Sequence, residues 1–251
     1  MNLGLIFDKL ILPNICLMPE DVQEYEDDPD SYIRNDLEES DTETNRRHCM
    51  KFAQQLSRKF PDELSVLMAK YISRCQEDFT KDGQSKWMQK VSLMNLLLTA
   101  TILQYSYKDG AVDIIVDQKE IFGYIQGLAL PELQEATLDQ KGILKATCIK
   151  FVYMFRNQIP GEQLTDFILL FARFLNSEKP VNQSYAAVCI EKLIAKRDWE
   201  SGEPMISSEV FNQKLASTLL TNFTNLLVKS KNLYAMRGLY RVAQHSGQGI
   251  T

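Results

Sequence analysis

The side chains with the clearest chemistry are the carboxylates of an acid-rich segment between residues 20 and 45, here called the acidic insert. Twelve acidic residues and one basic residue, Arg34, give the insert a charge of −11, whereas the whole chain of 251 residues carries −5. The remainder of the chain is therefore mildly basic. So strong a local charge attracts a basic partner, and it indicates recognition rather than catalysis.

Two other interpretations of these carboxylates compete with partner binding. Asp27, Asp28 and Asp30 could supply oxygen ligands to calcium, but the insert lacks the twelve-residue calcium loop with its central glycine. The second interpretation is a solvated loop whose like charges repel one another and that binds nothing. This second alternative stays open.

Part of the acidic insert is expected to fold. Tyr32, Ile33 and Leu37 can form one apolar helical edge, and Pro29 suits the first turn of that helix. The residues at 40–43, Ser-Asp-Thr-Glu, resemble an N-capping signal for the helix that follows. Their two carboxylates therefore serve either that helix terminus or a partner.

The sequence offers little material for an active site. His48 lies beside Cys49, but adjacent residues on a helix point about 100° apart and cannot form a nucleophile–base pair. His245 is expected in a frayed tail without a partner. The chain has no nucleophile elbow, no phosphate-binding glycine loop and no paired metal-ligand spacing. We expect no enzyme activity, no cofactor and no metal ion.

Composition narrows the class of partner. The chain is 45% hydrophobic and 24% charged with a pI near 5.2, which is typical of a soluble folded protein and not of a nucleic-acid binder. It shows no secretory signal and no run of about 18 apolar residues that could span a membrane. Five widely spaced cysteines indicate reduced thiols inside the cell: Cys16, Cys49, Cys75, Cys148 and Cys189. We expect neither nucleic-acid nor membrane binding.

The elements that must position these residues are helices. Apolar residues recur with helical spacing over 164–175, 186–194 and 215–227, and short breakers containing proline or glycine separate them. No segment shows sustained period-two alternation, so a strand is expected at most between Val112 and Val116.

The helices recur in a pattern. Segments with small residues or cysteine begin at Arg47, Met88, Ile143, Ser184 and Leu233, at separations of 41, 55, 41 and 49 residues. HEAT and armadillo hairpins repeat every 40–47 residues or so. We therefore predict an all-α fold, a HEAT-repeat (armadillo-like) α-solenoid of stacked helical hairpins over residues 1–251. A compact helical bundle is the alternative. Because both ends lack a capping repeat, we expect a fragment of a longer solenoid.

Four blocks of the sequence resemble the CAS-type exportins of the importin-β superfamily, the receptors that re-export importin-α. The blocks are IFDKLILPN (6–14), EDDPDSYIRNDLEESDTETNRR (26–47), CIKFVYMFRNQIP (148–160) and SYAAVCIEKLI (184–194). Their order and approximate spacing match the family. The resemblance implies a HEAT-repeat solenoid without catalytic residues, corresponding to a middle section of a much longer receptor.

The resemblance also implies partners. Members of this family bind importin-α together with Ran-GTP and shuttle between nucleus and cytoplasm, and GTP hydrolysis belongs to Ran. We expect a monomeric solenoid whose insert contacts a basic surface of Ran or importin-α. The residues expected to carry this contact are Glu24, Glu26, Asp27, Asp28, Asp36, Glu38 and Glu39. A general HEAT or armadillo scaffold that binds partners independently of Ran is the alternative function.

Overall fold

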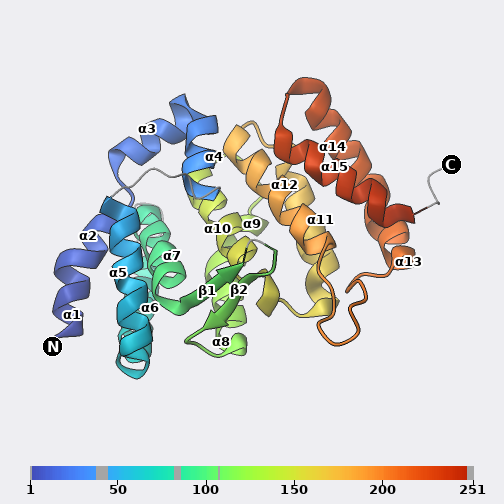
Figure 1. Ribbon diagram of the computed structural model, residues 1–251. Coiled ribbons are helices and arrows are strands. Elements are labelled where there is room, and N and C mark those ends of the chain that lie inside the picture. The colour runs from blue at the N-terminus through green and yellow to red at the C-terminus, as the bar shows by residue number, and fades with distance from the viewer. Residues whose placement is uncertain (1, 38–44, 82–85, 107, 248–251) are drawn as a thin grey trace. The chain divides into compact units, whose positions relative to one another are not determined.

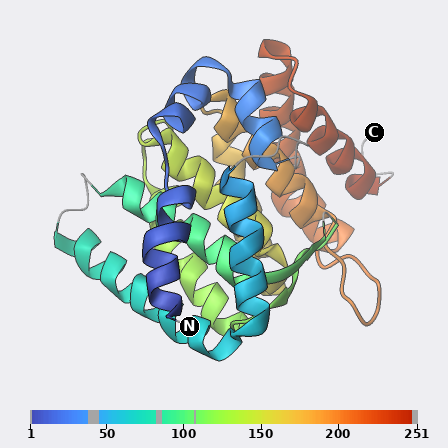
Figure 2. The same ribbon diagram turned by 60° about the vertical axis from the view of Figure 1, so that its left-hand side comes forward.

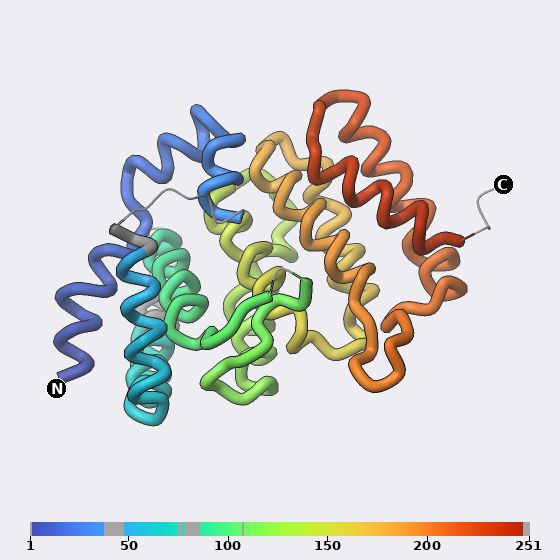
Figure 3. Tube along the Cα trace, viewed as in Figure 1, coloured from blue at the N-terminus to red at the C-terminus, as the bar shows by residue number. Residues whose placement is uncertain are grey.

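The structure is a computed structural model that describes residues 2–37, 45–81, 86–106 and 108–247, drawn in colour in Figure 3. Side chains at 45–47, 75, 76 and 78–81 are not described. The predicted cap at 40–43, with Glu38 and Glu39, lies outside the described residues. The chain divides into two compact units, an N-terminal unit of residues 1–128 and a C-terminal unit of residues 129–251.

The N-terminal unit is mainly helical (Figure 1). Its first helix runs from Leu3 to Ile15 through α1 (Leu3–Ile6), a π-helical turn η1 (Phe7–Ile11) and α2 (Leu12–Ile15). The other helices are α3 (Pro19–Asp27), α4 (Pro29–Leu37), α5 (Asn45–Lys59), α6 (Pro61–Lys81), α7 (Trp87–Thr101) and α8 (Gln118–Tyr124), and η2 (Ile125–Ala129) spans the boundary between the units.

The core of the N-terminal unit joins the first helix to α5, α6 and α7. Phe7, Ala53, Leu64 and Leu97 are all fully buried. The first helix lies beside α5, as Figure 2 shows at the left. Ser57 Oγ on α5 donates to the carbonyl of Ala100 on α7 over 2.7 Å, so a buried hydroxyl also ties these two helices together.

A β-hairpin interrupts the helices, and here the sequence-based prediction was wrong in part. Strand β1 (Ile102–Ser106) pairs antiparallel with β2 (Gly110–Ile114), whereas only a strand at 112–116 was expected. Gly110 has φ of 90°, a conformation that favours glycine, and it pairs with Ser106 at the turn. The apolar residues of β1 directly follow the apolar residues of α7, so the sequence pattern does not show where the helix ends and the strand begins.

The C-terminal unit consists of helical hairpins. Its elements are α9 (Leu130–Gln134), α10 (Gly142–Met154), the 3₁₀ turns η3 (Arg156–Gln158) and η4 (Gly161–Gln163), α11 (Leu164–Phe174), α12 (Pro180–Ile194), α13 (Ser208–Phe211), the π-turn η5 (Asn212–Ala216), α14 (Ser217–Lys229) and α15 (Leu233–Ser246). Helices α10, α12 and α15 pack successively side by side, while α11 pairs with α12 and α14 pairs with α15 (Figure 1). Two rows of helices result.

Each of the five segments that recur in the sequence lies in a helix of the structure. The five recurring segments fall in α5, α7, α10, α12 and α15. Small residues permit close packing within a hairpin, because a Cβ on Gly238 of α15 would lie 2.5 Å from the ring of Phe223 on α14. The all-α prediction is therefore correct apart from the hairpin, which is confined to the N-terminal unit in the described part of the chain.

Polar side chains fasten the segment between α9 and α10. The buried ammonium of Lys145 donates to the Thr137 carbonyl and lies 3.3 Å from Glu135 Oε2. Arg173 on α11 donates to the Glu135 carbonyl over 3.0 Å. Asp139 accepts from the Ser177 hydroxyl in the connection from α11 to α12. Neighbouring hairpins are thus linked by hydrogen bonds as well as by apolar packing, and the buried charge of Lys145 has partners.

Candidate protein-interaction site

The acidic insert contains two short helices, α3 and α4, that pack against each other in the N-terminal unit. Pro19 and Pro29 are their first residues, where a missing amide hydrogen costs nothing. The two helices therefore display the carboxylates of residues 20–37 on an ordered frame instead of a coil.

Aromatic and apolar contacts hold this frame. Ile33 is 2% exposed and Tyr25 is 3% exposed. The rings of Tyr25 and Tyr32 meet edge to face at 5.4 Å. The predicted helical edge of Tyr32, Ile33 and Leu37 is confirmed as a helix with Ile33 buried and the other two half-buried. The contribution of Tyr25 was missed, since it lies in the preceding helix.

Several of the carboxylates stabilise the two helices. Asp28 Oδ1 accepts from the Ser31 amide over 3.1 Å at the start of α4, and Asp21 Oδ2 accepts from the Met18 amide over 2.7 Å at the start of α3. Glu24 Oε1 accepts from Asn35 Nδ2 over 2.8 Å and thereby links α3 to α4. Glu24 and Asp28, which the sequence analysis expected to contact a partner, therefore also hold the insert together.

The carboxylates of the two helices are exposed to solvent to different degrees. Of the residues expected to contact a partner, Glu26, Asp27 and Asp28 are exposed, whereas Glu24 and Asp36 are half-buried. The structure thus brings the exposed three together at the junction of α3 and α4. Clustered exposed carboxylates can accept charge-assisted hydrogen bonds from arginine or lysine of another protein.

The sequence can now be compared with known proteins. The sequence model of the Cse1 family matches residues 1–190. The chain belongs to the Cse1 family. Among curated relatives, it is 30% identical to the importin alpha re-exporter of Saccharomyces cerevisiae over 98% of this chain and 26% of that protein. It is 29% identical to exportin-2 of Homo sapiens over 94% of this chain and 24% of that protein.

A solved structure of the Cse1 family has the same architecture. The exportin Cse1 in its cargo-free, cytoplasmic state superposes with a TM-score of 0.80 at 27% identity, covering 99% of this chain and 26% of that one. This match confirms the predicted HEAT-repeat solenoid and rules out the compact bundle. The chain spans about a quarter of the length of the Cse1-family relatives it matches.

Three of the described cysteines of this Cse1-family chain, Cys49, Cys148 and Cys189, are buried in its packing. Cys189 is fully buried and Cys49 is 8% exposed, and burial raises the pKa of both thiols. A raised pKa leaves little thiolate, so neither side chain is an activated nucleophile. Among residues with a described position, no group of three or more His, Cys, Asp or Glu could hold a metal ion. Nor does any helix in that part of the chain have the length and apolarity to cross a membrane.

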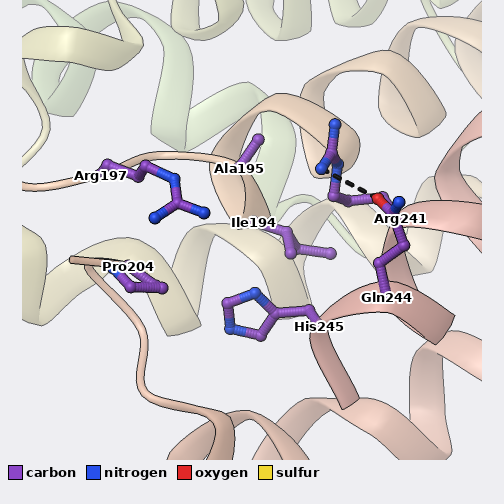
Figure 4. Close-up of a pocket in the computed structure, with 7 residues that line it drawn as sticks. All are labelled: Ile194, Ala195, Arg197, Pro204, Arg241, Gln244 and His245. Atoms are coloured by element: carbon purple, nitrogen blue, oxygen red, sulfur yellow. Dashed lines mark hydrogen bonds between the residues drawn. The ribbon is translucent and has the colours of Figure 1, made fainter. Parts of the chain in front are cut away.

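The prediction for His245 was wrong. Helix α15 continues to Ser246, and His245 Nε2 lies 2.8 Å from the Ile206 carbonyl while its ring contacts Phe211 at 4.7 Å. Because a carbonyl only accepts, Nε2 carries the hydrogen. His245 also lines a pocket in the C-terminal unit (Figure 4). Sequence reasoning missed this pocket, although Arg241, Gln244 and His245 have the spacing of one helical face.

Proposed function

We propose that this chain is part of a nuclear export receptor that carries importin-α from the nucleus to the cytoplasm in complex with Ran-GTP. The observation that supports this most is the match along 98% of the chain to a relative named for importin-α re-export. The agreement in fold with the exportin Cse1 adds to it. The receptor shuttles between the two compartments and acts by binding, and it neither carries a cofactor nor catalyses a reaction.

Nucleotide dependence tests this proposal. The full-length receptor containing these residues is immobilised and incubated with importin-α and with Ran loaded with GTP or GDP. Importin-α is expected to be retained only with Ran-GTP, because cooperative binding of the two partners lets the nucleotide control cargo release. Equal retention with Ran-GDP, or without Ran, would instead support a general HEAT scaffold that binds independently of Ran.

We further propose that the acidic insert contacts a basic surface of Ran or importin-α. The carboxylates concerned are Glu24, Glu26, Asp27, Asp28, Asp36, Glu38 and Glu39. Exposure favours Glu26 and Asp27 as direct contacts, since both lie at the solvent-facing end of α3. Glu24 and Asp28 also hold the two helices together, so their substitution would mix binding with folding.

A double charge reversal, Glu26→Lys with Asp27→Lys, tests the exposed pair, and thermal unfolding of the variant checks that the fold is kept. The reversal leaves the bonds of Glu24 and Asp28 in place and replaces two attractive charges by repulsive ones. We expect the affinity of the receptor for importin-α and Ran-GTP to fall by about tenfold or more. The matched control reverses two exposed acids elsewhere, Asp113→Lys with Glu162→Lys. Equal affinities for both double variants would contradict the role of the insert.

A further inference from the structure

The C-terminal unit contains a polar pocket of about 270 Å³ at the end of α12. Its polar lining comes from Arg197 after α12 and from Arg241, Gln244 and His245 on the last turns of α15, and Ile194, Ala195 and Pro204 complete the wall. Figure 4 shows the Arg197 guanidinium and the His245 ring on the same side of Ile194, with Arg241 beyond it. None of the lining residues is acidic, so the wall presents cationic and amide donors.

The arginines of this pocket are only partly satisfied by the protein. Arg241 Nη1 donates to Gln244 Oε1 over 3.1 Å, and Nη2 lies 3.9 Å from Glu191 Oε1. Arg241 Nε is buried and has no acceptor within the described residues. Arg197 Nη1 donates to the Gly202 carbonyl, which is uncharged. Donor capacity therefore remains for an anion.

The surroundings of the pocket are crowded with cations. Glu191 is shared between Arg241 and Lys192, whose Nζ lies 3.7 Å from its Oε1. Burial lowers the pKa of Lys192, and the charges of Arg156 and Arg241 lower it further while Glu191 opposes them. Positive groups therefore gather around Glu191, and a negative charge from outside would lower their mutual repulsion.

A tight loop beside the pocket presents an exposed tryptophan. Trp199 is 86% exposed. An isolated β-bridge between Arg197 and Pro204 closes the loop that contains it. Asp198 Oδ1 accepts from the Ser201 amide over 2.8 Å and from two further donors in the loop. These bonds fix the loop, so docking on Trp199 costs little conformational entropy, and tryptophan and arginine are enriched in binding hot spots.

We propose that the pocket and the Trp199 loop form a docking site for an acidic segment of a partner protein. Carboxylates of the segment bind Arg197 and Arg241 through paired hydrogen bonds, and an adjacent apolar side chain packs on Trp199. The exposed acids Glu200 and Glu203 in the loop repel negative charge outside the pocket, so the site suits one or two carboxylates beside an apolar residue and not a continuous polyanion such as RNA. This site lies at the end of α12, on α15 and in the loop that follows α12, so its test depends neither on the acidic insert nor on the export role.

Fluorescence anisotropy tests the site with the 251-residue chain. The probe is a fluorescein-labelled peptide of alternating glutamate and leucine, and inorganic phosphate and oligouridylate serve as competitors. We expect the peptide to bind, and Arg197→Gln and Trp199→Ala each to weaken it by about tenfold. A hexaglutamate peptide is expected to lose affinity with Arg197→Gln but not with Trp199→Ala.

Arg237→Gln is the matched control, because Arg237 is exposed on α15 one turn before Arg241 and does not line the pocket. It is expected to leave peptide affinity within about twofold of the wild type. Arg197 is exposed, so its substitution should keep the fold, which thermal unfolding checks. The proposal is overturned by no peptide binding at millimolar concentration, by equal effects of the Arg197 and Arg237 variants, or by tighter binding of oligouridylate than of peptide.

Discussion

At the scale of single residues, Lys196 has the most demanding environment. Its ammonium donates to the carbonyls of Arg156 over 3.1 Å, Asn157 over 3.3 Å and Ile159 over 2.7 Å. Arg156 and Asn157 belong to the 3₁₀ turn η3, and Ile159 directly follows it. Lys196 thereby binds a backbone turn that lies 37 to 40 residues earlier in the chain.

This environment predicts a pH dependence of stability. Burial, assisted by the charge of Arg156, lowers the pKa of Lys196 from 10.5 to about 8. Between these values the unfolded state binds more protons than the native state, so the contribution of Lys196 to the free energy of unfolding rises with pH. Burial raises the pKa of Tyr71 and Tyr124 above the ordinary value of 10. Their contributions to the free energy of unfolding therefore decline only above pH 10, where the unfolded chain loses these protons first.

Two measurements check the Lys196 prediction between about pH 7 and 10, a range that contains the lowered pKa and stays below the range in which the tyrosines ionise. An NMR titration of the Lys196 side chain should give a midpoint near 8. Urea unfolding of the wild type should show a steeper rise in stability with pH than unfolding of Lys196→Met. A titration midpoint above 10 would contradict the prediction.

At the scale of elements, the contact between α14 and α15 depends on a missing side chain. Gly238→Ala would place a Cβ 2.5 Å from the Phe223 ring, which is fully buried and cannot retreat. We expect a loss of about 1–3 kcal/mol in the free energy of unfolding, despite the higher helix propensity of alanine.

Gly123→Ala is the control for this substitution. Gly123 lies in α8, and nothing is within 4 Å of an added Cβ. Alanine is expected to stabilise this helix by about 0.5–1 kcal/mol, because only propensity changes. Urea unfolding of both variants measures the difference. Two shifts of the same sign would show that the close approach does not limit packing.

The helices could be predicted from sequence because each buries one face at a regular spacing. Helix α11 follows its predicted range, since Leu164, Phe167 and Phe171 all point into the core. Strand β1 could not be predicted, since it prolongs the apolar pattern of α7 and is defined by its pairing with β2. Local periodicity carries no information on such pairing.

The candidate site shows the same limit. Charge identified the insert, but only the structure shows that Glu24 and Asp28 bond within it while Glu26 and Asp27 face solvent. The basic pocket could not be predicted from the sequence, because its lining residues, such as Arg197 and Arg241, lie far apart in the chain. Each lining residue taken alone resembles an ordinary charged surface position.

At the scale of the whole molecule, charge is unevenly distributed along the chain. The acidic insert carries −11 on a chain of −5, so the rest is mildly basic. If the insert steers a basic partner, the association rate with importin-α and Ran-GTP should fall with salt, because exposed charges are screened within about 10 Å at 0.1 M.

Stopped-flow measurements at several salt concentrations check this prediction on the full-length receptor. The dependence of the association rate on salt should be weaker for the double reversal of Glu26 and Asp27 than for the control reversal of Asp113 and Glu162. Dissociation rates should change less with salt than association rates. Identical salt dependence of all three proteins would exclude steering by the insert.

The exposed Trp199 makes tryptophan fluorescence a probe of its loop. The chain has two tryptophans, Trp199 at 86% exposure in the C-terminal unit and the half-buried Trp87 at the start of α7 in the N-terminal unit. Each unit therefore contains one tryptophan. With Trp87→Phe the tryptophan emission reports on the Trp199 loop, and with Trp199→Phe it reports on the start of α7. Docking at the loop and unfolding around α7 can thus be followed separately without an attached dye.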